Sequence, residues 1–140
     1  MIFIVDTNIL FSGLLRDSTT RELLIDCPFI LYVPETIITE IRKYEEEIIR
    51  RSGLATDDFE LLLSLLIKNI IVVEKEKYED KMKDASELIG HADKDDIPFL
   101  ALALKVPNNG IWTENIKHFE KQNLIKVWTT KDILDVLDKT

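Results

Sequence analysis

Acidic residues at distant points of this chain are of the type and placement that hold a hard metal ion. The four that matter most are Asp6, Glu40, Asp93 and Asp96. Mg²⁺ and Mn²⁺ prefer carboxylate oxygens and water as ligands, usually in octahedral geometry. A carboxylate-held Mg²⁺ ion most often serves phosphoryl chemistry, where it activates water and stabilises an in-line displacement. The residue types therefore predict an oxygen-only site for Mg²⁺ or Mn²⁺ that acts on a phosphate ester.

Other kinds of site are disfavoured by what the sequence lacks. His91 and His118 are the only histidines and Cys27 is the only cysteine, so zinc has no usable set of ligands. A single cysteine forms no internal disulfide, and Cys27 is expected to be a small buried or half-buried hydrophobic residue. The chain contains no P-loop, no GxSxG elbow and no glycine-rich dinucleotide motif.

Short apolar runs that alternate with helical patterns predict the framework for these acids. Five runs read as strands: Ile2 to Val5, Phe29 to Val33, Ile70 to Val73, Gly110 to Thr113 and Ile125 to Trp128. Strands separated by helices indicate crossover connections, which make a parallel sheet with helices on both faces. We expect residues 1–140 to form a single α/β domain, a three-layer α/β/α sandwich with a five-stranded parallel sheet.

The helices follow from the apolar spacing between the strands. Pro34 is expected to open one helix, with Ile37, Ile41 and Tyr44 on its inner face and Ile48 extending that face. Four other helices are expected, at Asp58 to Ile67, Lys75 to Ile89, Ile97 to Leu104 and Lys131 to Leu137. Thr56 or Asp57 is the expected cap of the first, and Thr129 or Thr130 that of the last. The second is expected to end at Gly90.

This architecture brings the acidic residues to one edge of the sheet. Parallel strands all end at the same edge, and ligands bind just outside it. Asp6 ends the first strand, and Glu40 borders the apolar face of the helix after the second. Asp96 precedes the apolar helix, where one aspartate would serve as a cap. Three aspartates within four residues exceed that need, so we favour metal binding for Asp96, weigh it evenly for Asp93, and expect Asp95 to be solvated.

The net charge of −8 has two opposing consequences. An acidic surface repels nucleic acid, whose affinity is dominated by phosphate contacts. Clustered carboxylates, in contrast, attract a divalent cation that changes the local sign of the charge. The apolar runs are too short to span a bilayer and no basic leader precedes them, so we expect a cytoplasmic protein without membrane contact.

Four segments together resemble the PIN-domain family of Mg²⁺-dependent ribonucleases. They are VDTNILFSGLL, PETIITEI, DKDDIPFLALAL and GIWTENIKHF, and they occur in the family's order over nearly the whole chain. The first and third segments are the specific ones. The resemblance implies a five-stranded parallel sheet in a Rossmann-like sandwich, an acidic metal centre and a homodimer. Many small members are the toxins of toxin–antitoxin pairs of the VapC type, which implies an antitoxin protein as a partner.

The resemblance also implies roles for individual residues. Asp6 matches the first metal-binding aspartate, and Glu40 matches the glutamate on the helix after the second strand. Asp96 matches the aspartate immediately before the apolar helix, and Asp93 matches an extra acid found in one branch of the family. These four residues are the expected metal ligands, and Asp6, Glu40 and Asp96 are the expected catalytic residues.

Three further positions are expected to position water or phosphate, and one of them departs from the family pattern. Asn8 matches the polar residue of the DTN motif, and Thr113 matches the Ser/Thr that ends the fourth strand. Two residues later the family has a fourth acid, whereas this chain has Asn115. An amide ligates through its oxygen or orients water but brings no charge, which puts a second metal in doubt. Glu114 is adjacent, but its place at a strand end should point it elsewhere.

These observations predict an endoribonuclease that hydrolyses RNA phosphodiester bonds with a Mg²⁺- or Mn²⁺-activated water. The alternative is a PIN-like module with weak or no turnover that serves RNA binding or assembly, which the acidic charge and Asn115 favour modestly. A receiver-like phosphate acceptor fits less well, because Lys126 lies within the fifth strand and not beyond it.

Cations and a histidine near the expected site have two interpretations each. Arg16, Arg42 and Lys43 lie close in sequence to expected ligands and are candidates for contacting the RNA backbone. Surface solvation explains each of them at least as well. His118 beside Phe119 is favoured as a capping or packing residue over a catalytic base.

Overall fold

A five-stranded, all-parallel sheet forms the centre of the protein in a computed structural model that describes residues 1–90 and 94–139. The strand order is β3-β2-β1-β4-β5. The strands are β1 (Ile2–Val5), β2 (Ile30–Pro34), β3 (Ile70–Val73), β4 (Ile111–Trp112) and β5 (Val127–Trp128). The five predicted strands are confirmed, although β4 and β5 are shorter than expected and β2 is displaced by one residue.

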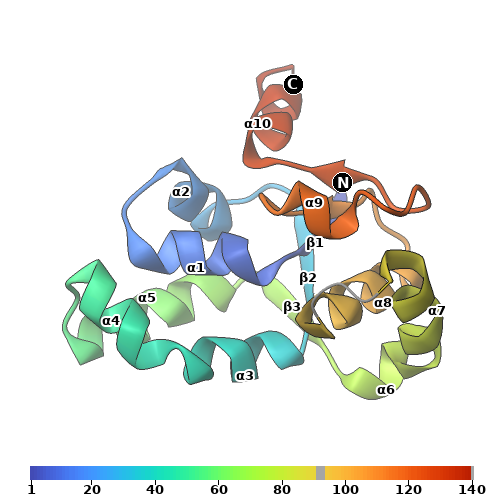
Figure 1. The fold of residues 1–140 in the computed structure, drawn as a ribbon. Coiled ribbons are helices and arrows are strands. Elements are labelled where there is room, and N and C mark those ends of the chain that lie inside the picture. Colours follow the sequence, from blue (N-terminus) through green and yellow to red (C-terminus); the bar gives the residue numbers. More distant parts are fainter. Residues whose placement is uncertain (91–93, 140) are drawn as a thin grey trace.

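Helices cover both faces of this sheet, so the predicted three-layer α/β/α sandwich is confirmed. They are α1 (Thr7–Leu15), α2 (Thr19–Ile25), α3 (Thr36–Lys43), α4 (Glu45–Ser52), α5 (Thr56–Ile67), α6 (Lys75–Tyr78), α7 (Met82–Ile89), α8 (Ile97–Lys105), α9 (Ile116–Phe119) and α10 (Thr130–Asp138). Helices α1, α2 and α5 lie on one side of the sheet, and α6, α7 and α8 lie on the other (Figure 1).

The strand order reverses beside β1, which defines where a ligand can bind. From β1 the chain builds β2 and then β3 on one side, and it returns to add β4 and β5 on the other. Open parallel sheets bind ligands at the carboxyl edge where the order reverses. Val5 and Trp112 are paired at the ends of β1 and β4. The residues that follow them, Asp6 and Thr113, are therefore neighbours at this edge.

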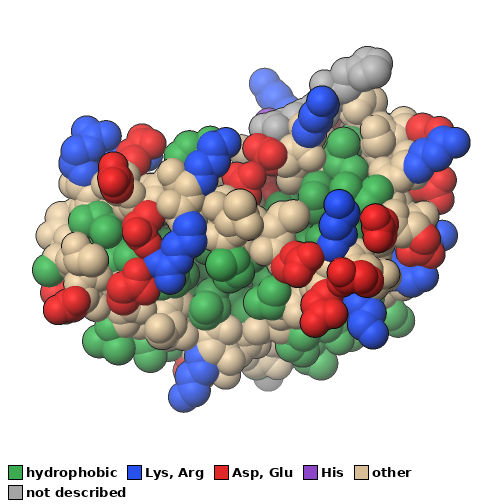
Figure 2. Space-filling model, turned by 90° about the horizontal axis from the view of Figure 1, so that it is seen from below, with side chains coloured by type: hydrophobic (Ala, Val, Ile, Leu, Met, Phe, Trp, Pro, Cys, Tyr) green, Lys and Arg blue, Asp and Glu red, His purple; other side chains and the backbone are tan. Residues whose placement is uncertain are grey.

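Charged and apolar side chains share the surface. On the face seen from below in Figure 1, acidic and basic side chains are interspersed around patches of hydrophobic ones (Figure 2). Within residues 1–90 and 94–139, no helix combines the length and the apolar character that crossing a membrane requires. Cys27 is half-buried and packs against the core, as predicted, and its burial raises the pKa of the thiol.

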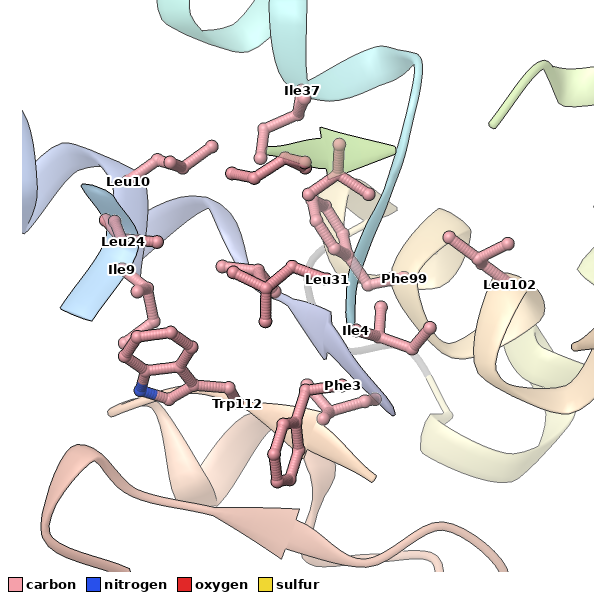
Figure 3. Close-up of a cluster of buried hydrophobic side chains, with 14 of the residues drawn as sticks. Phe3, Ile4, Ile9, Leu10, Leu24, Leu31, Ile37, Phe99, Leu102 and Trp112 are labelled. Carbon is pink, nitrogen blue, oxygen red and sulfur yellow. The ribbon is translucent and has the colours of Figure 1, made fainter. Parts of the chain in front are cut away.

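The core occupies both faces of the sheet, and the part between the central strands and helix α8 explains the apolar composition of both. Phe3 and Ile4 of β1 are completely buried, and Phe99 and Leu102 of α8 are almost completely so. In Figure 3 Ile4 lies beside Phe99 and Leu102, whereas Phe3, the preceding residue of the strand, points to the other face of the sheet. Burial of side chains of this size contributes roughly 1.5–3 kcal/mol each. The first residues of α8 are thus held rigidly at the edge of the sheet.

Two details of the helix after β2 differ from the prediction. Pro34 ends the strand, where it pairs in register with Val73, so α3 begins two residues later than expected. The predicted single helix is broken at Tyr44, which ends α3 and precedes α4 with φ −105° and ψ 12°. The ring of Tyr44 packs edge-on against Phe11 of α1 at a centroid distance of 5.8 Å. A tertiary contact thus coincides with a break that local spacing does not encode.

The other helices also depart from simple periodicity. The predicted helix from Lys75 to Ile89 is interrupted by a 3-10 turn, Glu79–Lys81, between α6 and α7, and it ends before Gly90 as expected. The N-cap of α5 is Ala55, not Thr56 or Asp57, and it has no side-chain cap hydrogen bond. Two aspartates in the first turn of α5 favour the helix dipole instead.

The last strand and helix are joined by a well-defined cap. Thr129 is the N-cap of α10, and its hydroxyl accepts a hydrogen bond from the backbone of Asp132. The Asp132 carboxylate accepts one in return from the backbone of Thr129, which completes a capping box. The prediction of Thr129 as one of two possible caps is confirmed.

Gly110 allows β4 to approach β5 closely. Its φ angle is 140°, and an added Cβ would lie 2.3 Å from the carbonyl oxygen of Lys126 and 2.6 Å from the indole of Trp128. Only glycine fits at such a close approach of two backbones. This residue therefore permits the pairing that places Thr113 beyond the end of β4.

Candidate active site

Asp6 lies at the junction of β1 and α1 and is only 3% exposed. One carboxylate oxygen, Oδ1, accepts a hydrogen bond of 2.8 Å from the backbone of Thr7, so Asp6 also acts as the N-cap of α1. The other, Oδ2, accepts hydrogen bonds from Asn8 Nδ2 at 3.1 Å and from Thr113 Oγ1 at 2.7 Å. Hydrogen bonds to both oxygens fix the direction of the carboxylate.

Thr113 is completely buried and is the centre of this hydrogen-bond network. Its hydroxyl donates to Asp6 and accepts from Asn8 Nδ2 at 3.1 Å and from the backbone of Asn115 at 2.9 Å. The Asn8 side-chain oxygen in turn accepts a bond of 3.3 Å from the backbone of Glu114. The DTN motif is thereby tied to the residues that follow β4, more than a hundred positions later.

Asp96 is the second buried carboxylate of the site and is 7% exposed. It is the N-cap residue of α8, but its side chain makes no cap hydrogen bond with that helix. Capping of α8 is therefore not the role of the Asp96 side chain. The oxygen Oδ2 lies 2.8 Å from Nδ1 of His118, which follows β4 on helix α9.

The two buried aspartates and Glu40 line a single pocket of about 260 Å³ at the carboxyl edge of the sheet. Glu40 is half-buried and reaches the pocket from helix α3. The remaining wall is formed by Thr7, Asn8, Phe11, Tyr44, Asp95, Asn115 and His118. Asp95 is exposed, as expected. Segments far apart in the sequence thus contribute their acidic residues to one hollow.

The pocket can be tested against the metal that its residues predict. Within the described parts of the chain, no three acidic, histidine or cysteine side chains form a group that would hold a metal ion by themselves. Asp93, the fourth expected ligand, lies outside the described residues. Mg²⁺ commonly keeps several waters and binds to one or two carboxylates. Two buried carboxylates on the wall of one pocket fit that manner of binding.

Asn115 and Glu114 behave differently from each other. Asn115 lines the pocket at the position where an acid was expected. Glu114 turns away, because its carboxylate accepts a hydrogen bond of 2.8 Å from the backbone of Thr130 at the start of α10. Glu114 does not replace the missing charge, and the pocket carries one acid fewer at this corner.

Five residues of the pocket were not assigned to it by the sequence: Thr7, Phe11, Tyr44, Asp95 and His118. His118 was expected to be a capping or packing residue but contacts Asp96, Tyr44 was expected on the inner face of a helix, and Phe11 was given no role. The wall positions of Phe11 and Tyr44 depend on how α1 packs against α3 and α4. The spacing of Phe11 at i+3 from Asn8 in the first helix was the only available indication.

Comparison with known proteins assigns the chain to a family. A search of curated proteins gave no match. A family model described as a PIN domain matches residues 4–138, which covers the sheet and the pocket. PIN domains are generally nucleases and generally use a divalent metal. The chain belongs to the PIN-domain family.

Proposed function

We propose that this protein is a Mg²⁺- or Mn²⁺-dependent endoribonuclease that hydrolyses RNA phosphodiester bonds in the acidic pocket. The observation that carries the proposal is the pair of buried carboxylates, Asp6 and Asp96, on the wall of one open pocket. Both carboxylates border the same pocket, where a divalent cation would offset the cost of burying their charges. Asp96 is buried without capping its helix, so a structural role in capping does not explain it.

In the proposed enzyme, Asp6, Glu40 and Asp96 would hold the metal and Asp93 would assist. When bound, a Mg²⁺ ion supplies an activated water and stabilises the charge that develops at phosphorus. Thr113 keeps the Asp6 carboxylate in one orientation through its 2.7 Å hydrogen bond. Mutation of a residue that hydrogen-bonds to a metal ligand commonly lowers metal affinity or activity by about 10–100-fold.

The other polar residues of the pocket have positioning roles. The side-chain amide of Asn8 donates to both Asp6 and Thr113, so Asn8 holds the network together. Asn115 faces the pocket without a charge and would orient a phosphate oxygen or water. His118 lies against Asp96 and positions that carboxylate at the mouth of the pocket.

Cleavage of RNA by the purified protein tests the proposal. A mixed-sequence single-stranded RNA incubated with Mg²⁺ or Mn²⁺ should be cut internally, and EDTA should stop the reaction. The Asp6→Asn and Asp96→Asn variants should both be inactive, whereas Asp84→Asn, an exposed acid on α7, serves as the matched control. Cleavage that survives in the Asp6→Asn protein would indicate a contaminating nuclease.

The alternative is a PIN-like module that binds RNA or serves assembly without useful turnover. It is favoured by Asn115 in place of an acid and by the net charge of −8. If the wild-type protein does not cut RNA and calorimetry detects no binding of Mn²⁺, this alternative holds.

We further propose that the protein is the toxin of a toxin–antitoxin pair, acts in the cytoplasm and forms a homodimer. Membership of the PIN-domain family supports this part of the proposal. Expression of the chain alone should arrest growth, and co-expression of a small neighbouring gene should relieve the arrest. Unchanged growth with soluble, RNA-cleaving protein would contradict the toxin assignment. Sedimentation of the purified protein tests the dimer.

A further inference from the structure

A second pocket adjoins the acidic pocket along helix α1 and contains two arginines. It has a volume of about 570 Å³, and its wall is formed by Asn8, Phe11, Ser12, Leu15, Arg16 and Arg51. Asn8 and Phe11 belong to the walls of both pockets. The two hollows therefore meet, with carboxylates in one and guanidinium groups in the other. We refer to the second as the arginine pocket.

We propose that the arginine pocket binds a backbone phosphate of single-stranded RNA next to the phosphate that is cleaved. The inference rests on the proposed nuclease function and adds to it a defined subsite and a path for the substrate. Guanidinium groups bind phosphate oxygens through paired N–H donors, which gives direction as well as affinity. An acidic protein needs such a local site, because most of its surface repels RNA.

The arrangement of helix α1 defines the path. Asn8, Ser12 and Leu15 are spaced four and three residues apart, so they lie on one face of the helix. At the rise of an α-helix, the distance from Asn8 to Leu15 is roughly 10 Å. Arg16 follows directly as the C-cap residue. A strand whose reacting phosphate lies beside Asp6 would follow this face of α1 to reach Arg16.

The two arginines are available to bind an anion. No described carboxylate lies within ion-pair distance of Arg16, which is exposed. Arg51 lies 3.9 Å from Glu47, one turn earlier on α4, and its side chain is 58% exposed. An exposed pair at this distance contributes little, so Arg51 can exchange it for a phosphate. Arg51 comes from a different helix, and the packing of α4 on α1 brings it to the pocket.

The other candidate cations are already engaged within the protein. Arg42 donates hydrogen bonds to Glu60 at 2.6 and 3.2 Å and also contacts Glu45. Lys43 lies 5.3 Å from the centre of the Tyr44 ring. Basic side chains on the face shown in Figure 2 are likewise interspersed with acidic ones. From the sequence, Arg16, Arg42 and Lys43 were equal candidates for contacting RNA. In the structure, Arg42 and Lys43 have partners within the protein, whereas Arg16 has no described carboxylate within ion-pair distance.

An aromatic pair at the junction of the two pockets favours a single strand over a duplex. Phe11 lines both pockets, and the ring of Tyr44 packs edge-on against it. Tyr44 is 37% exposed and presents part of its ring to the acidic pocket. Proteins that bind single strands combine a basic groove with aromatic rings on which unpaired bases stack. Unpaired bases are available for such stacking in a single strand but not in a duplex.

Binding of RNA without cleavage tests the subsite directly. A fluorescein-labelled single-stranded oligoribonucleotide of mixed sequence is titrated in EDTA, and its anisotropy is followed at increasing salt. The Arg16→Gln/Arg51→Gln variant is compared with Arg42→Gln/Arg50→Gln, which changes the net charge equally and removes no side chain of the arginine pocket. Thermal unfolding of each variant verifies that it is folded.

The expected result is weaker binding in the first variant alone. We expect its affinity at low salt to fall at least about tenfold, and the slope of log K against log salt to fall by about one. The control pair should stay within about twofold of wild type. Equal affinity and slope in both variants and wild type would overturn the subsite. If the subsite is overturned in this way but the protein still cleaves RNA with Mn²⁺, the proposed nuclease function is unaffected. A wild-type protein that neither binds nor cuts RNA would overturn the subsite and the nuclease function together.

Discussion

The hydroxyl of Thr113 donates a 2.7 Å hydrogen bond to the carboxylate of Asp6, across 107 positions of the sequence. This contact joins the ends of β1 and β4, the two strands between which the order of the sheet reverses. It ties the first acidic residue of the pocket to the last strand that borders it. The stability of the fold and the geometry of the site therefore depend on the same buried pair.

Replacing Thr113 by valine should weaken the site and the fold together. Valine keeps the shape of threonine but leaves Asp6, Asn8 and the backbone of Asn115 without their shared partner. We expect a loss of about 1–3 kcal/mol in the free energy of unfolding. Metal affinity, measured by calorimetry with Mn²⁺, should fall by about 10–100-fold. Thr113→Ser retains the hydroxyl and should restore most of both. Full Mn²⁺ affinity in the valine variant would contradict the role of Thr113.

Asp6→Asn should remove metal binding with little harm to the fold. Asparagine is as good an N-cap as aspartate, so α1 should keep its start and the free energy of unfolding should change by no more than about 2 kcal/mol. Loss of the charge should reduce activity at least about 100-fold, more than the loss of an indirect partner. Chemical denaturation and an RNA cleavage assay on the same preparation measure the two effects. Large destabilisation with normal activity per folded molecule would contradict this assignment.

Gly110→Ala should be much more damaging than Gly53→Ala. A Cβ at Gly110 meets backbone of Lys126 and the indole of Trp128, whereas one at Gly53 meets nothing within 4 Å. The Gly53 variant bears only the cost of a positive φ, about 1 kcal/mol. We expect at least about 3 kcal/mol at Gly110, because β4 and β5 must separate. Urea denaturation compares the two. Equal losses would show that the strands move apart easily at this point.

Glu60→Gln should change how stability depends on pH. Hydrogen bonding to Arg42 lowers the pKa of Glu60 in the folded protein. The pair therefore stabilises the protein above the ordinary glutamate pKa of about 4.3, and that contribution disappears as the pH falls through the lower folded value. The wild type should melt at a slightly higher temperature than the variant at pH 7 and at the same temperature in strong acid. Glu46→Gln, an exposed acid on α4, is the control, and a difference that persists in acid would contradict the pair.

Cys27 should react slowly with thiol reagents. Burial raises the pKa of its thiol, so less of the reactive thiolate is present at pH 8 than in an exposed cysteine. Alkylation followed by mass spectrometry should be several-fold slower in the native protein than in the denatured one. Rates that are equal in the two states would show that the site is open to solvent.

The sheet and the acidic edge were predictable because local patterns encode them. The apolar runs at Ile2–Val5 and Ile70–Val73 have the bounds of β1 and β3, because β-branched residues favour strands even where, as in the edge strand β3, some of them are exposed. Alternation with helices then required a parallel sheet. Asp6 and Asp96 could be placed at its edge because one follows a strand and the other precedes a buried helix.

What could not be predicted depends on packing between elements. The break at Tyr44 has no proline or glycine, and it coincides with a contact to α1. Arg51 is in the last turn of a charged helix, and only the packing of α4 on α1 brings it near Asn8. His118 reaches Asp96 because α9 follows β4 directly at the edge of the sheet.

The order of the strands also governs when the pocket can exist. β1, β2 and β3 can pair while the chain is still being synthesised, but the open side of β1 waits for β4. Until residue 113 has been made, Asp6 lacks the hydroxyl that orients it, and His118 is not yet there to meet Asp96. The part of the chain that emerges first from the ribosome therefore contains Asp6 without the residues that complete the acidic pocket. The site can assemble only after β4 and α9 have been translated.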